Sequence, residues 1–106
     1  MIKQVFLIKK NPAMTFDEFK KHYLEVHAPL VMRSFPEIRK YVVSLALQRG
    51  KETAYDAITE IYWDDFETLV KIAKSEVYKN DIVKDEERFM QRDALHVILT
   101  EEFPQK

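Results

Sequence analysis

The sequence has no cysteine and only one glycine, Gly50. Without cysteine, the chain can form no disulfide, no thiolate nucleophile and no cysteine-based metal site. With one glycine, it cannot build the glycine-rich loops that bind nucleotide phosphates. No metal-ligand spacing of histidine and carboxylate residues stands out either. We therefore expect a protein without metal or cofactor.

A charge excess of one sign and a long hydrophobic run are also missing. The chain has 17 basic and 18 acidic residues, a formal net charge of −1, which favours neither nucleic acid nor an anionic membrane as a partner. The apolar run near the start is about five residues long, too short for a signal peptide or a membrane span. The default expectation is a cytoplasmic protein.

What is present suffices for one folded domain over residues 1–106. Hydrophobic residues make up 46% of the chain, and seven Phe, five Tyr and one Trp can form a core. Because a domain of this size exposes a large fraction of its surface, self-association is one route to stability.

Four segments rich in β-branched and aromatic residues are predicted strands. They are 2–9, 41–47, 55–63 and 95–100. A helix is predicted over 16–33, and a second opens at the N-cap Asp64, with Glu67 at the third helical position. Residues 75–92 form a broken helical region. This β-α-β-β-α-β order indicates an α+β, ferredoxin-like subunit with a four-stranded antiparallel sheet and both helices on one face.

The strands are apolar on both faces, although the helices can cover only one. Val5 and Leu7 alternate with Phe6 and Ile8, and all four are apolar. A second subunit packed sheet to sheet is the simplest cover for the other face. The alternative is that the first and last strands are central and covered within one chain.

The stretch 11–41 contains the main candidate site. Thr15 and Glu18 form a capping box that starts the helix. An apolar stripe at helical spacing follows, formed by Phe16, Phe19, Tyr23, Val26, His27 and Leu30. Because Pro29 cannot donate a helical hydrogen bond, we expect the helix to kink or stop there, leaving the His27 imidazole partly desolvated beside free carbonyl groups.

Three motifs in the right order resemble the EthD-like family. They are FKKHYLEVHAPL followed by Tyr41, then YDAITEIYWDDFETLVKIAKS, then Asp85 and Phe89 in a D-x-x-x-F element. The resemblance covers nearly the whole chain and implies a dimeric α+β barrel, in which ferredoxin-like subunits pair through their sheets. One departure is Tyr23, where many relatives have tryptophan, and it leaves the shape of a pocket beside His27 open.

The resemblance gives only a general guide to function. The family takes its name from a protein needed for bacterial ether degradation. Relatives in the wider superfamily include cofactor-free cyclases, isomerases, decarboxylases, dehydratases and quinone-forming monooxygenases, and others bind and degrade heme. The fold alone does not choose among them.

His27 is the first candidate catalytic residue, as a general acid or base. The alternative is a structural histidine that bonds a free carbonyl or a tyrosine. Glu60 is the candidate that would orient the imidazole, and Tyr41 and Tyr62 would donate hydrogen bonds to a substrate oxygen. Equally, Glu60 and Asp56 could pair with basic residues of a second subunit, and the tyrosines could be core residues.

A pocket between the first helix and the sheet would bind the substrate. Its predicted substrate-binding residues are Phe19, Tyr23, Leu30 and Asp56. His22 lies ~140° from His27 around a regular helix, so the two cannot share a metal. We therefore expect His22 to be a solvated surface residue. His96 reads as structural, and the Lys/Glu runs at 83–88 and 101–102 read as solvated faces.

Three hypotheses about function remain. The first is a homodimeric, cofactor-independent enzyme that cyclises, isomerises, dehydrates or decarboxylates a hydrophobic oxygenated small molecule. The second is a non-catalytic ligand-binding or accessory protein of a degradation pathway. The third is a heme-binding barrel protein with a histidine ligand.

Overall fold

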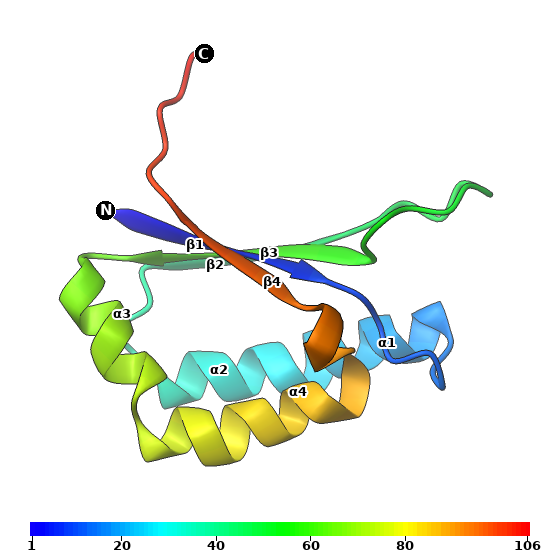
Figure 1. Ribbon diagram of the computed structural model, residues 1–106, viewed down its shortest axis with the longest axis horizontal. Coiled ribbons are helices and arrows are strands. Elements are labelled where there is room, and N and C mark those ends of the chain that lie inside the picture. The colour runs from blue at the N-terminus through cyan, green and yellow to red at the C-terminus, as the bar shows by residue number, and fades with distance from the viewer.

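The chain folds into two layers, a four-stranded antiparallel sheet and a layer of helices on one face (Figure 1). The computed structural model describes all residues, 1–106. The strands are β1 (Ile2–Ile8), β2 (Lys40–Leu45), β3 (Ala57–Trp63) and β4 (His96–Thr100), in the spatial order β2-β3-β1-β4. The helical segments are α1 (Phe16–His22), η1 (Tyr23–His27), α2 (Ala28–Ser34), α3 (Phe66–Ala73), η2 (Tyr78–Ile82), α4 (Val83–Phe89) and η3 (Arg92–Ala94). The predicted α+β, ferredoxin-like order is confirmed.

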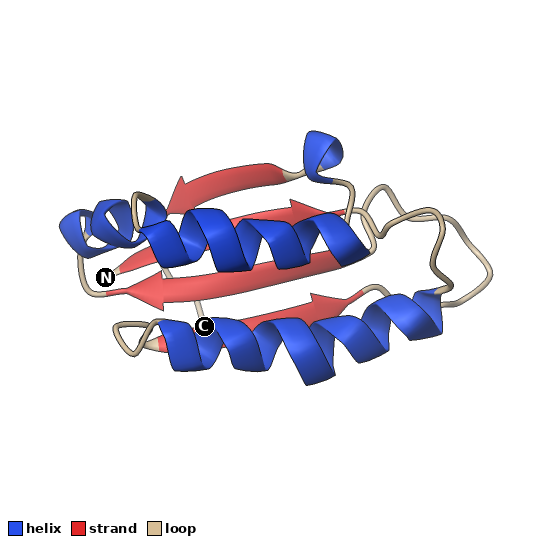
Figure 2. Cartoon of the chain, turned by 90° about the horizontal axis from the view of Figure 1, so that it is seen from below, coloured by secondary structure: helices blue, strands red, loops and turns tan.

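The segment α1-η1-α2 and the segment η2-α4 lie side by side beneath the sheet (Figure 2). The four strands all form within two residues of their predicted ends. None of the helices has both the length and the apolar composition needed to cross a membrane.

The first helix begins where the capping box predicts, but Pro29 does not end it. Thr15 Oγ1 accepts from the backbone of Glu18, and the Glu18 carboxylate accepts from the backbone of Thr15. Just before Pro29 the chain forms the π-helical turn η1, in which the Ala28 N–H donates to the Tyr23 carbonyl, and α2 then continues. The wider turn gives the proline ring space that a regular α-helix lacks, so of the two expected outcomes, a kink or a stop, the stop is wrong.

The second helix is capped one residue later than predicted. The Asp65 carboxylate accepts from the backbone of Thr68 at 2.8 Å, whereas Asp64 pairs with the exposed Arg39. The predicted broken helical region becomes a second π-helical turn, η2, followed directly by α4. Each of the two facing helical segments therefore contains a π-helical turn.

The core fills the space between the helices and one face of the sheet. From the sheet it takes alternate residues, such as Phe6, Ile8, Ile61 and Trp63, and all of these are buried. Val26, which the apolar stripe placed inside, is 45% exposed, because the π-helical turn changes which residues of the helix face the sheet.

The other face of the sheet carries no helix and has an apolar centre. Val5 pairs with Ile98 on one side, and Leu7 pairs with Ile58 on the other. Ile58 and Ile98 are 43% and 51% exposed. We call this surface the open face; its central residues are Val5, Leu7, Val42, Ile58 and Ile98.

Candidate functional site

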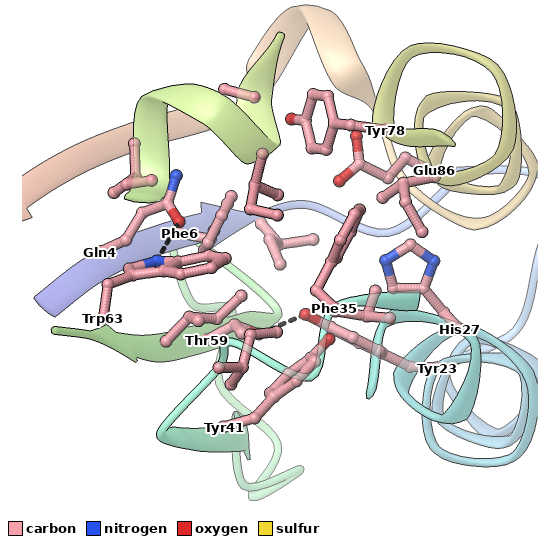
Figure 3. A pocket seen from close by; sticks show the side chains of 18 of the residues that line it. Gln4, Phe6, Tyr23, His27, Phe35, Tyr41, Thr59, Trp63, Tyr78 and Glu86 are labelled. Carbon is pink, nitrogen blue, oxygen red and sulfur yellow. Dashed lines mark hydrogen bonds between the residues drawn. The ribbon is translucent and has the colours of Figure 1, made fainter. Parts of the chain in front are cut away.

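A cavity of about 60 Å³ lies between the helices and the sheet (Figure 3). Of the 19 residues that line it, 15 are hydrophobic or aromatic, and none is Lys or Arg. The other four are Gln4, His27, Thr59 and Glu86. An apolar lining with a few convergent polar groups is typical of small-molecule sites, and the volume, below the ~300–1,000 Å³ of pockets for drug-sized ligands, restricts this one to compact ligands.

His27 ends η1 and lies at the wall of this cavity. Its side chain is buried, and its Nδ1 lies 2.7 Å from Oδ2 of Asp85 on α4. Because a carboxylate can only accept, Nδ1 carries the hydrogen, and in the neutral ring the lone pair is on Nε2. Nε2 has no hydrogen-bond partner in the chain, and no enclosed polar side-chain atom lacks one. Nε2 is therefore open to the cavity as a base.

The surroundings keep this pair as a neutral imidazole and an ionised carboxylate. Burial lowers the pKa of His27, although the hydrogen bond with Asp85 acts in the opposite direction. Burial by itself would raise the pKa of Asp85, but the hydrogen bonds from His27 and His22 bring it below its ordinary value. At neutral pH, His27 can therefore accept a proton.

Asp85 also binds His22, which the sequence placed on the solvated surface. The Nε2 atom of His22 lies 3.0 and 3.1 Å from the two oxygens of Asp85. Between the two histidines runs η1, and a π-helical turn brings residues five apart above one another because its hydrogen bonds span five residues. The ~140° separation of a regular helix does not apply here, and His22 is half-buried rather than solvated.

Phe89 completes the support of both imidazoles. It lies one helical turn after Asp85 on α4, is fully buried, and its ring centre is 5.1 Å from that of His22 and 4.7 Å from that of His27. The D-x-x-x-F element thus holds the two rings with a hydrogen-bond acceptor and an aromatic face.

Glu86 is a second buried carboxyl group at the cavity. It is 4% exposed, and Arg92 Nε donates to its Oε1 at 3.0 Å. Burial raises the pKa of Glu86 to about 7, against the opposing effect of Arg92. The prediction that the charged run 83–88 is a solvated face is wrong for Asp85 and Glu86, because α4 turns Asp85 toward η1 and Glu86 toward the cavity.

Tyr23 and Tyr41 line the cavity near Thr59, as Figure 3 shows. The hydroxyl group of Tyr23 shares a hydrogen bond with Thr59 Oγ1. Burial raises the pKa of Tyr23 to about 12, and it also raises the pKa of Tyr41. Both phenols are therefore protonated at neutral pH and able to donate.

Glu60 and Tyr62 lie on the open face, separated from His27 by the sheet. Glu60 accepts from Lys3 Nζ at 2.7 Å, and the Tyr62 hydroxyl donates to Glu102 at 2.8 Å. Alternate residues of a strand face opposite sides, and it is Thr59 and Ile61 that face the cavity. The expectation that Glu60 orients His27 is not met within the subunit, where Asp85 has that position.

The three other residues predicted to bind substrate lie outside the cavity. Phe19 is fully buried behind it, against Phe89 and Tyr23. Leu30 lies in an outer groove between the helices. Asp56, at the end of the sheet, accepts from the backbone of Lys10 at 2.8 Å. Of the residues predicted for the site, the structure brings together His27, Tyr23 and Tyr41.

Asp85 and Glu86 are not among the site residues predicted from the sequence, although one sequence signal points to Asp85. The D-x-x-x-F element places an acid and an aromatic residue on one face of a helix. Glu86 had no such signal, because in sequence it is one of several charged residues of α4.

Comparisons with known proteins agree with this structure. An EthD family protein of Bacillus halodurans is 26% identical over 97% of this chain and 100% of its own, with a TM-score of 0.75. An EthD-like protein of Ralstonia eutropha is 17% identical over 99% and 94%, with a TM-score of 0.75. A protein of Thermobifida fusca, described as dimeric, ferredoxin-like and of unknown function, is 13% identical over 93% and 88%, with a TM-score of 0.70.

No curated protein sequence matches the chain. The model of the EthD domain matches residues 11–93, which include His27, Asp85 and Glu86. Since this match covers most of the chain, the protein belongs to the EthD domain family.

Proposed function

We propose that the protein is a small homodimeric enzyme that uses His27 as a general acid–base on a hydrophobic oxygenated small molecule. The reaction would be of the cyclase, isomerase, dehydratase or decarboxylase type. The observation that carries the proposal is His27 itself, whose Nδ1 is held by Asp85 while Nε2 is open to an apolar cavity.

The arrangement suits proton removal next to a carbonyl group. Nε2 of His27 would take the proton, and Asp85 would stabilise the imidazolium ion and keep Nδ1–H in place. The phenol of Tyr41 would donate a hydrogen bond to the substrate oxygen as negative charge develops there. Every step uses side chains of this chain.

The proposed dimer forms through the open face. Its apolar centre leaves Ile58 and Ile98 about half exposed, and an apolar surface of this kind favours association. The Thermobifida fusca protein with the same fold is described as dimeric. Sheet-to-sheet pairing would bury this face and put the Lys3–Glu60 pair between the subunits.

The second candidate is a non-catalytic ligand-binding protein. It is favoured by the small size of the cavity and by its mostly apolar lining. In that case a ligand would bind beside His27 without chemical change.

The test measures exchange of the α-hydrogens of cyclohexanone for deuterium in D₂O by NMR. We expect the wild type to accelerate exchange, His27→Asn to abolish the acceleration, and the matched control His96→Asn, on the other side of the sheet against Tyr55, to retain it. Circular dichroism and sedimentation confirm that each variant is folded and assembled.

If cyclohexanone raises the melting temperature of the wild type but its exchange is not accelerated, the ligand-binding candidate replaces the enzyme. A Soret band on adding heme that disappears in His27→Asn would favour a heme protein over both.

A further inference from the structure

Glu86 is a titratable group at the cavity that acid–base chemistry by His27 and Asp85 does not use. Glu86 directly follows Asp85 on α4, and its carboxyl group lines the same cavity as the His27 ring. Figure 3 shows the Glu86 carboxyl group beside the Tyr78 ring, on the same side of the cavity as His27. Two adjacent residues of one helix thus serve different purposes, since Asp85 holds the base and Glu86 reaches the cavity itself.

Only one oxygen of this carboxyl group is engaged within the chain. Oε1 accepts from Arg92 Nε, whereas Oε2 has no hydrogen-bond partner. Because no enclosed polar side-chain atom lacks a partner, Oε2 is open to the cavity. A carboxyl group placed in this way can give a proton to a bound molecule.

The groups around Glu86 decide its protonation. The titratable and charged groups that face it are Asp85 and Glu87 on its own helix, Arg92 on η3, Tyr78 on η2, His27 and Tyr23 on η1, and Tyr41 on β2. Arg92 is the cation that forms a hydrogen bond with Glu86, and burial outweighs its effect on the pKa of Glu86. Below neutral pH the group is therefore the protonated acid, while the neighbouring Asp85 is ionised.

We propose that Glu86 is the proton donor that acts together with His27, and that the substrate is an uncharged compact ketone or hydroxyketone. The inference rests on the proposed function and deepens it. His27 Nε2 takes a proton from the carbon next to the carbonyl group, and the electrons of that C–H bond form the C=C bond of an enol. The carbonyl π electrons move to oxygen, which takes the proton of Glu86. The product is the enol tautomer of the substrate, with no net change in atoms. The imidazolium gives its proton to solvent and the Glu86 carboxylate takes one from solvent, and in D₂O the reverse steps place a deuteron from His27 on the carbon.

The charge of the cavity selects the substrate. No Lys or Arg lines it, and the guanidinium group of Arg92 is already held by Glu86. An anionic substrate would bury a charge without a partner beside a carboxyl group. A cationic substrate would hold Glu86 in its ionised form and remove the proton to be donated. An uncharged ligand avoids both costs.

The first test repeats cyclohexanone exchange with Glu86→Gln, with Glu87→Gln as the matched control because Glu87 is the exposed neighbour on the same helix. Glu86→Gln is expected to slow exchange roughly tenfold or more at pH 6 and to remove the fall in wild-type rate above pH 7. Glu87→Gln is expected to match the wild type. If Glu86→Gln keeps the wild-type rate and pH profile while His27→Asn is inactive, the role of Glu86 is overturned and the proposed function stands.

The second test does not depend on activity. The infrared spectrum of Glu86→Gln is subtracted from that of the wild type, both at pH 6. The difference should contain a positive C=O band from the protonated carboxyl group of Glu86. Absence of that band overturns the donor even if exchange occurs. If the wild type shows the band but does not accelerate exchange, the His27 mechanism fails and the donor role fails with it.

The third test compares cyclohexanone with 4-oxocyclohexanecarboxylate, its charged counterpart. The neutral ketone should raise the melting temperature and be exchanged, whereas the carboxylate should do neither. If both compounds raise the melting temperature and are exchanged equally, the requirement for an uncharged substrate is overturned. The role of Glu86 is then decided by the first two tests.

Discussion

Carboxylates lie on both faces of the sheet, but their surroundings differ. On the open face, Glu60 and Glu102 share the ammonium group of Lys3, and these hydrogen bonds raise the pKa of that lysine. On the helix-covered face, Asp85 accepts from two imidazoles and Glu86 keeps one oxygen free at a cavity. On the open face, the carboxylates and Lys3 satisfy one another. On the covered face, Nε2 of His27 and one oxygen of Glu86 have no partner in the chain and are available to a ligand.

This difference shows how burial gives similar residues different chemistry. Burial raises the pKa of Glu86 to about 7, whereas the hydrogen bonds of two histidines bring the pKa of Asp85, its neighbour in sequence, below the ordinary value against the effect of burial. Neighbouring titratable groups whose surroundings separate their pKa values are a recurrent arrangement for acid–base catalysis.

Asp85→Asn should have the largest effect on the covered face. An amide in this position can no longer hold Nδ1–H of His27 as a charged acceptor, so cyclohexanone exchange should fall about 10²-fold or more. Unfolding free energy should fall by about 1–3 kcal/mol, since a buried hydrogen-bond acceptor is altered. The exposed Asp81→Asn serves as the matched control. An Asp85→Asn variant with the wild-type exchange rate would contradict the assigned role.

Ile58→Asp should have the largest effect on the open face. The side chain lies at the apolar centre of that face, and a carboxylate buried there without a partner would destabilise sheet-to-sheet pairing by several kcal/mol. Sedimentation should find a dimer for the wild type and a monomer for the variant. Val77→Asp, on the helical side, is the control with similar exposure. A monomeric wild type would refute the proposed assembly.

Glu86→Gln should change how stability depends on pH. The folded-state pKa of about 7 lies above the ordinary 4.5, so Glu86 favours the folded state at low pH, and this contribution is lost as pH rises from 4.5 to about 7. At 1.36 kcal/mol per pKa unit, the loss is about 3 kcal/mol. Between pH 4.5 and about 7, the unfolding free energy of the variant, measured in urea, should therefore depend less on pH than that of the wild type. If the unfolding free energies of the wild type and the variant change in parallel from pH 5 to pH 8, the pKa of Glu86 is not raised in the folded state.

Glu60→Gln should have the smallest effect. Within one subunit its ion pair with Lys3 is partly solvated, so in the monomeric Ile58→Asp background its removal should cost less than about 1 kcal/mol. In the otherwise unchanged protein, exchange should stay within about twofold of the wild type. A loss as large as that of His27→Asn would mean that the open face takes part in catalysis after all.

Much of the fold could be predicted from local patterns. Alternating apolar residues predicted β1 and β3, and the Thr15–Glu18 capping box predicted where α1 begins. These features depend on residues close together in sequence, and the structure confirms them. The cap of α3 was misplaced by one residue because Asp64 and Asp65 are chemically equivalent, and only the pairing of Asp64 with Arg39 distinguishes them.

The candidate site could be predicted only in part. Its place on an apolar stripe before Pro29 predicts His27 as a site residue, and Tyr23 and Tyr41 are predicted with it. The sequence also favours Glu60 as the partner of His27, because it is a carboxylate on a central strand, yet the strand alternation turns it to the open face. Sequence separation hides the true partner, since Asp85 lies 58 residues from His27.

The sequence alone determined the order of the elements, the double-sided apolar strands and the presence of one histidine on a buried helix face, because all of these follow from local spacing and composition. The tertiary structure decided which groups meet. The π-helical turn η1 brings His22 and His27 to the same side, and the packing of α4 against it supplies Asp85 and Glu86. That outcome depends on how two helices pack and on how deeply their polar groups are buried.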